Sequence, residues 1–178
     1  MSARSAFGGF LLTAAALGGM QLNAQGIAAH NSQAPVDFDA GRIELQDRQN
    51  RVSLSGNVTV RQAGLTVSSN RMLVNYTDDG SLDIQRITAT GGVSVSRGSE
   101  SASGDVAIYD LGRRIITMAG NVRLQRGGDT LSGGRLVIDL QTGLSSVDGR
   151  ASGVSTGSSN SGGRVTGSFS VPQNGDEN

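Results

Sequence analysis

The side chains with spacing suited to catalysis are few, and they do not assemble an active site. Residues 153–157 (GVSTG) match the Gly-x-Ser-x-Gly pattern of a nucleophile elbow, in which a serine hydroxyl attacks an acyl carbon. That chemistry needs a helix after the serine and a histidine base. Ser155 is instead followed by more Ser and Gly, and the sole histidine is His30. We interpret the match as chance.

Two pairs of carboxylates are the remaining candidates, for acid–base chemistry or metal binding. Asp37 and Asp39 alternate with apolar residues, so on a strand both would face solvent. Asp78 and Asp79 open a turn sequence, Asp-Asp-Gly-Ser, that lacks the ligand spacing of a calcium loop. The chain has no cysteine, which removes thiolate metal sites and disulfides. The sequence therefore predicts no catalytic residue, no metal and no cofactor.

The dominant pattern of the chain is apolar residues two apart, the period of a β-strand with one apolar face. A second recurring pattern, a small residue followed by mostly apolar residues three, five and seven positions later, alternates with a glycine motif. This repetition predicts an all-β protein built from strand pairs. The glycine motif occurs in residues 54–60 (LSGNVTV), 89–95 (ATGGVSV) and 118–124 (MAGNVRL), and more weakly in 147–151 (VDGRA).

The glycines of this motif, Gly56, Gly91, Gly120 and Gly149, have the same parity as the apolar residues. On a strand they would face inward, where a missing side chain permits a bend or bulge and the close approach of a facing sheet. No helix-forming stretch follows any of them, so a nucleotide-phosphate site is not indicated. We interpret these glycines as folding devices.

Composition narrows the possible partners. The 178 residues suffice for one domain with a substantial core, and that core is almost wholly aliphatic because aromatic residues make up 3 % of the chain. All 15 basic residues are arginines, and they balance 15 acidic residues without forming a charge run. Nucleic acid and anionic membrane surfaces are therefore disfavoured as partners.

The ends of the chain differ from its middle. Arg4, an apolar stretch too short to span a membrane and a small residue at position 24 are typical of a signal peptide cleaved before Gln25. A Ser- and Gly-rich segment late in the chain is expected to be a flexible loop. The predicted organisation is a signal peptide at 1–24, a linker at 25–34, a β domain at 35–171 with the flexible loop at 152–163, and a disordered tail at 172–178.

The long aliphatic face has two physical interpretations. Two facing sheets of about eight short strands each would have an inner face roughly 35 to 40 Å long. Facing side chains could fill it completely, as in an ordinary sandwich. Aliphatic residues of modest size could equally leave the sheets splayed enough to admit alkyl chains, each methylene of which would contribute ~0.8 kcal/mol. These physical arguments leave both interpretations open.

A family resemblance favours the second interpretation. The motif Leu/Met-x-Gly-Asn-Val-x-Val/Leu, in residues 54–60 and 118–124, occurs together with residues 35–38 (PVDF) and 69–74 (SNRMLV). In order, spacing and position behind a signal, these segments resemble the LptA/OstA family of periplasmic lipopolysaccharide transport proteins, over about residues 35–151. The resemblance implies an open β jelly roll of two V-shaped antiparallel sheets, about 16 short strands in all, that holds lipid A acyl chains between them.

The same resemblance implies partners and a location. It predicts a non-enzymatic bridge in the periplasm that carries lipopolysaccharide from the inner to the outer membrane for outer-membrane assembly. Its members join head to tail with each other, and with similar folds on an inner-membrane anchored LptC-like protein and an outer-membrane LptD-like translocon. Strand addition of this kind is physically sensible because an open sheet edge offers unpaired backbone donors and acceptors.

Lipid-binding residues follow partly from the resemblance and partly from parity. The resemblance implies lipid contacts for Val36 and Phe38 in the first strand and for Val95, Tyr109 and Leu111 in the middle. Without lysines, contacts to lipid phosphates would fall to arginines such as Arg71, Arg97 or Arg135, which we expect to be solvated outward charges. Parity adds Val58, Val60, Val74, Tyr76, Val122, Leu124, Leu136 and Ile138.

Three alternatives remain. An inner-membrane anchored partner of the same transport system would retain residues 1–24. A ligand-free structural β-repeat protein would have a filled core, although glycine intervals of 35, 29 and 29 residues are uneven for a regular repeat. An enzyme acting on envelope polysaccharide would need an inward carboxylate pair, which the pattern does not supply.

Overall fold

The structure, a computed structural model, describes residues 30–150 and 163–170. Its ten strands form one continuous antiparallel sheet, and η1 (Asp47–Gln49) is a short 3-10 helix. The strands are β1 (Asp37–Asp39), β2 (Arg42–Gln46), β3 (Arg51–Gln62), β4 (Leu65–Asp78), β5 (Leu82–Arg97), β6 (Glu100–Asp110), β7 (Ile115–Arg126), β8 (Asp129–Asp139), β9 (Ser145–Asp148) and β10 (Thr166–Ser168).

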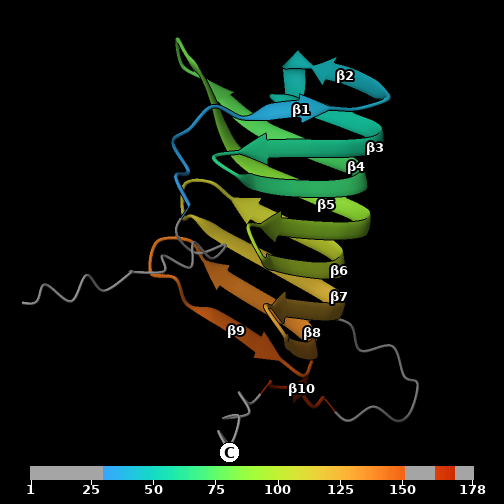
Figure 1. Cartoon of the computed structure of the whole chain (residues 1–178). Helices are drawn as coiled ribbons and strands as arrows, with labels where there is room; N and C mark the ends of the chain where they lie inside the picture. The colour runs from blue at the N-terminus through green and yellow to red at the C-terminus, as the bar shows by residue number, and fades with distance from the viewer. Residues whose placement is uncertain (1–29, 151–162, 171–178) are drawn as a thin grey trace, which may run out of the picture.

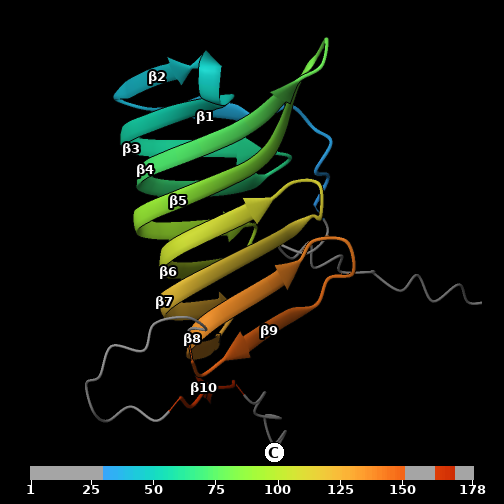
Figure 2. The ribbon, with the colours of Figure 1, turned by 180° about the vertical axis from the view of Figure 1, so that it is seen from behind.

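The sheet folds back on itself into two layers because the long strands β3 to β8 each cross a corner near mid-length. In β3, residues 51–55 pair with β2, whereas residues 59–61 pair with β1. One layer therefore runs from β2 to β9 and the other from β1 to β10; we call them the β2 layer and the β1 layer. In Figure 1 the strands are stacked between these two ends and curve round at the right, and Figure 2 shows the same stack from behind.

Several corners are β-bulges in which two consecutive residues have left-handed backbone angles. Gly56 and Asn57 have φ of 82° and 50°, and Gly120 and Asn121 have φ of 76° and 48°. The pairing register shifts at both corners. Glycine and asparagine tolerate this conformation, whereas β-branched residues rarely do. The prediction that glycines of the repeated motif permit a bend is therefore confirmed.

The all-β class and the open antiparallel architecture agree with the sequence-based expectation, but the number of strands does not. The structure has ten strands where about 16 short ones were expected. The reason is continuity: at a bulge the backbone bends without breaking its pairing, so one long strand serves both layers. The strand expected near residues 165–171 is present as β10.

The space between the layers is the hydrophobic core. Alternate residues of the long strands point into it, and in β6 the burial alternates along the whole strand except next to the corner. Leu54, Met72, Ile116, Met118 and Leu136 are at most 1 % exposed. Each such side chain contributes ~1.5–3 kcal/mol to folding. The core is a row of aliphatic side chains that follows the stack from end to end.

The predicted segment boundaries stay predictions. Residues 1–24, and almost all of the loop at 152–163 and the tail at 172–178, lie outside the described residues. The last part of the predicted linker, residues 30–34, is described and lies against the domain, as set out below.

Candidate functional site

The interior between the layers contains most of the residues predicted to contact lipid. Val36, Tyr76 and Leu111 are partly buried and lie toward its openings, and Phe38 in β1 is 47 % exposed. The other predicted residues, at most 6 % exposed, are Val58, Val60, Val74, Val95, Tyr109, Val122, Leu124, Leu136 and Ile138.

Several interior residues were missed by the sequence reasoning. Leu54, Met72, Ile87, Ile116 and Met118 are as buried as the predicted set and lie on the same strands. They follow the same alternation, so extending the parity argument across each corner would have found them. The predicted residues and these five line one continuous apolar interior.

The interior is closely filled in its middle and opens only toward its margins. A cavity of about 10 Å³ lies among Val67, Ala89 and Val95, at the centre of the stack. An apolar cavity of about 70 Å³ lies beside Phe38 near β1, and one of about 130 Å³ lies beside Phe169 near β10. An alkyl chain could therefore enter the middle only if the two layers moved apart.

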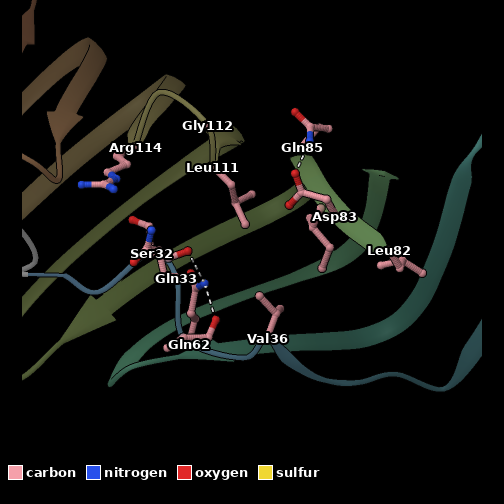
Figure 3. A pocket seen from close by; sticks show the side chains of 12 residues that line it. Ser32, Gln33, Val36, Gln62, Leu82, Asp83, Gln85, Leu111, Gly112 and Arg114 are labelled. Atoms are coloured by element: carbon pink, nitrogen blue, oxygen red, sulfur yellow. Dashed lines mark hydrogen bonds between the residues drawn. The ribbon is translucent and has the colours of Figure 1, made fainter. Parts of the chain in front are cut away.

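The largest opening, which we call the mouth pocket, lies on the side of the stack opposite the corners and has a volume of about 570 Å³ (Figure 3). Its walls come from the start of β5, from the turn after β6 and from the segment that precedes β1. Apolar side chains of Val36, Ile84 and Leu111 alternate with polar ones. The polar lining residues are Ser32, Gln33, Gln62, Asp83, Gln85 and Arg114.

A buried polar cluster closes one side of this pocket. The Gln62 side chain, at the end of β3, is 4 % exposed, and its Oε1 lies 3.1 Å from Tyr109 Oη and 2.9 Å from His30 Nε2. The rings of His30 and Tyr109 meet edge to face at 6.2 Å between centroids. Gln62 and Tyr109 belong to different layers, so the cluster joins the layers across the interior.

Burial alters the acidity of both rings in this cluster. Desolvation lowers the pKa of His30 below its ordinary value of 6.5; the hydrogen bond with Gln62 opposes this, and the charge of Arg97 reinforces it. Desolvation likewise raises the pKa of Tyr109 above 10.0. His30 is therefore held neutral at pH values where an exposed histidine would begin to take up a proton.

We predict that the midpoint of an NMR titration of His30 lies below 6.5 in the folded protein. The unfolded chain then binds the proton more tightly, so stability is complete above pH 6.5 and falls as the pH drops toward the lower folded pKa. Because the chain has one histidine, its imidazole signals need no assignment by mutation. A midpoint at or above 6.5 would contradict the burial of this ring.

The arginines considered for phosphate contacts lie outside the apolar interior. Arg71 is exposed on β4, whereas Arg97 and Arg135 are partly buried, and each of these two has an interaction partner. The carboxylates considered for catalysis do not converge: Asp37 and Asp39 are exposed on β1, and Asp78 and Asp79 are exposed at the β4–β5 turn. The GVSTG segment lies outside the described residues.

The two ends of the stack carry apolar side chains on short edge strands. At the first end, Ile43 and Leu45 of β2 are 45 % and 69 % exposed. At the other end, Leu144 is 69 % exposed beside β9 and Phe169 is 66 % exposed beside β10. Within the described residues, β1 and β2 pair only with β3, while β9 and β10 pair only with β8, so each has an edge free for another strand.

Comparison with solved structures identifies the fold. The chain superposes on LptH, the LptA homologous periplasmic component of the lipopolysaccharide transport device of Pseudomonas aeruginosa, with a TM-score of 0.68. The match covers 79 % of this chain and 98 % of LptH at 19 % identity. In the part of the chain that the structure describes, no helix has the length and apolar character that crossing a membrane requires.

Sequence comparisons identify the family. A curated relative, an uncharacterized protein of Rhizobium meliloti (strain 1021), is 30 % identical over 98 residues, which is 52 % of this chain and 52 % of the relative. The chain thus spans about half the length of that relative. The family described as "LptA/(LptD N-terminal domain) LPS transport protein" matches residues 37–144, from β1 to the turn before β9. With this match over more than half of its length, the chain belongs to the LptA/LptD N-terminal domain family of lipopolysaccharide transport proteins.

Proposed function

We propose that this protein binds lipopolysaccharide by its lipid A acyl chains, between the β1 layer and the β2 layer, and carries it across the periplasm from the inner to the outer membrane. The observation that carries the proposal is the aliphatic interior, which continues from one end of the stack to the other in a member of a lipopolysaccharide transport family. Such transport needs no reacting group, so the proposed role is not enzymatic.

Binding in this interior requires the layers to part. The central cavity of about 10 Å³ is far smaller than an acyl chain, whereas the mouth pocket of about 570 Å³ offers a place to begin. The glycine and asparagine corners are on the side opposite the mouth, and their short side chains leave the bend free to open. Each methylene that replaces a protein–protein contact retains ~0.8 kcal/mol of apolar burial.

The free edges at the two ends support a bridge of several domains. An edge strand of one copy can pair with the edge at the opposite end of the next, which would continue both the sheet and the apolar interior. Exposed Leu45 at one end and Phe169 at the other would lose contact with water in that arrangement. By the same pairing, the ends would join an inner-membrane anchored LptC-like protein and an outer-membrane LptD-like translocon.

A second candidate function is a ligand-free structural repeat protein, and the closely filled middle of the core is the observation that favours it. It differs from the first in what the purified protein carries. An anchored inner-membrane partner differs instead in keeping residues 1–24.

The test is mass spectrometry of the protein purified from the periplasm of a Gram-negative host. We expect lipopolysaccharide in the extract and a mature chain that begins near Gln25. Retention of residues 1–24 would favour the anchored partner. A correctly folded, exported protein without lipid would favour the structural repeat.

A further inference from the structure

Residues 30–36, which precede β1 and which we call the mouth segment, lie on the open side of the folded sheet. In Figures 1 and 2 this stretch runs along the side opposite the corners, past the ends of the long strands. Ser32, Gln33, Ala34 and Val36 line the mouth pocket together with the β5 start and the turn after β6. The mouth segment therefore occupies space at the entrance to the apolar interior.

One side chain of the domain receives much of this segment. Gln62 Nε2 donates hydrogen bonds to the carbonyl oxygens of Ser32 at 3.0 Å and Ala34 at 2.8 Å. Its Oε1 bonds with His30 Nε2 at 2.9 Å and accepts from Tyr109 Oη at 3.1 Å. The amide thus uses all four of its hydrogen-bonding positions.

These bonds hold a polar group where the apolar interior would otherwise continue. Val60, two residues before Gln62 on the same face of β3, is 4 % exposed, and Tyr109 comes from the facing layer. An acyl chain that passed from the mouth pocket between these residues would need the place that the mouth segment and its cluster now hold. A buried amide loses its hydrogen bonds at high cost, so the closed arrangement resists opening until something replaces it.

Its other anchoring is slight. Val36 packs against the core with part of its side chain, and β1, which follows, pairs with β3 over only three residues. Within the segment, Ala34 N donates to Asn31 O at 3.3 Å and Gln33 N to Asn31 Oδ1 at 3.1 Å, so it keeps its own turn when it moves. The segment can therefore leave the mouth as a unit without unpairing a long strand.

We infer that the mouth segment is a latch: held by Gln62, it closes the mouth of the empty domain, and it is displaced when acyl chains enter. This inference rests on the proposed function and adds a closed state to it. A protein whose binding-competent state is only partly populated binds its ligand more weakly by that fraction. Loosening the latch should therefore strengthen lipid binding, which is the opposite of what loss of a lipid contact would do.

The first test measures the position of the segment. The chain has no cysteine, so spin labels at Gln33→Cys and Gly112→Cys report the distance across the mouth pocket without background. A second pair, Ser99→Cys with Gly112→Cys, joins the turns of the two layers and reports their separation alone. On adding lipid A, we expect the distance from residue 33 to residue 112 to lengthen and broaden beyond any change in the second pair. Bound lipid A with an unchanged distance from residue 33 to residue 112 would overturn the latch.

The second test measures affinity for lipid A in Gln62→Ala, with Gln125→Ala as the matched control on an exposed position of β7. We expect Gln62→Ala to bind about tenfold more tightly and the control to stay within about twofold of wild type. Equal or weaker binding by folded Gln62→Ala would overturn the latch. If wild type and both variants, all folded by circular dichroism, bind no lipid A, the proposed function fails and the latch with it. Should Gln62→Ala not fold, the spin-label distances decide alone.

Discussion

Gly120→Ala is expected to lower the free energy of unfolding by about 3 kcal/mol, a large effect for the addition of one methyl group. Gly120 is at a corner of β7 and has φ of 76°, an angle that alanine adopts only with strain. A Cβ atom there would also lie 2.9 Å from Cγ and 3.0 Å from Cβ of Asp105. That carboxylate already accepts a hydrogen bond from Asn121 Nδ2 at 2.8 Å, so moving it would cost a second interaction.

Gly80→Ala is the matched control for this prediction. Gly80 has φ of 94°, but in its turn a Cβ atom would meet nothing within 4 Å. We expect a loss of about 1 kcal/mol from the backbone angle alone. Urea unfolding of the two variants and wild type gives both values. Equal losses would show that the corner is not closely packed and that only the backbone angle matters.

Phe38→Glu is expected to weaken lipid A binding about thirtyfold, equivalent to about 2 kcal/mol. Phe38 borders an apolar cavity of about 70 Å³ whose lining includes Val52, Leu54 and Val74. A carboxylate at this opening would have to give up water whenever an acyl chain lay beside it. Because Phe38 is 47 % exposed in the empty domain, we expect stability to change by less than about 1 kcal/mol.

The matched control is Thr59→Glu, which adds the same charge to the outer face of the neighbouring strand, paired with Asp39 in β1. Titration with lipid A, at a protein concentration that keeps the chain monomeric, compares the two variants. Unchanged affinity in Phe38→Glu would remove Phe38 from the lipid path. Equal weakening in both variants would indicate a general charge effect instead.

Local patterns in the sequence were enough to predict the fold class. The alternation of apolar and polar residues depends only on strand geometry, and the bends follow from the conformational freedom of Gly56 and Gly120. Continuity of the strands was not predictable in the same way. Two residues at each bulge oppose one on the partner strand, so the sequence alone does not tell a corner from a chain break. The β3–β4 turn was missed because Ala63, with φ of 45°, is an unusual residue for a left-handed position.

The candidate site was predicted only in its apolar part. Val95 and Leu136 follow from parity, but His30 and Gln62 are polar residues 32 positions apart, and no local pattern joins them. Their burial depends on a tertiary contact between the predicted linker and the end of β3. Sequence reasoning also left open whether the interior is filled or hollow. The structure describes a filled middle and a wide mouth, because the balance depends on side-chain packing across two layers.

The measurement that tests the central claim most directly is photo-crosslinking in living cells. A photoreactive residue would replace Val36, Phe38, Val95 or Leu111, with Thr59 as the outward control. We predict lipopolysaccharide adducts at the four inward positions and not at Thr59; an adduct at Val95, which is 0 % exposed in the empty domain, would require the layers to part. Absence of adducts at all four positions in a folded, exported protein would contradict lipid transport and leave a structural protein with a filled core.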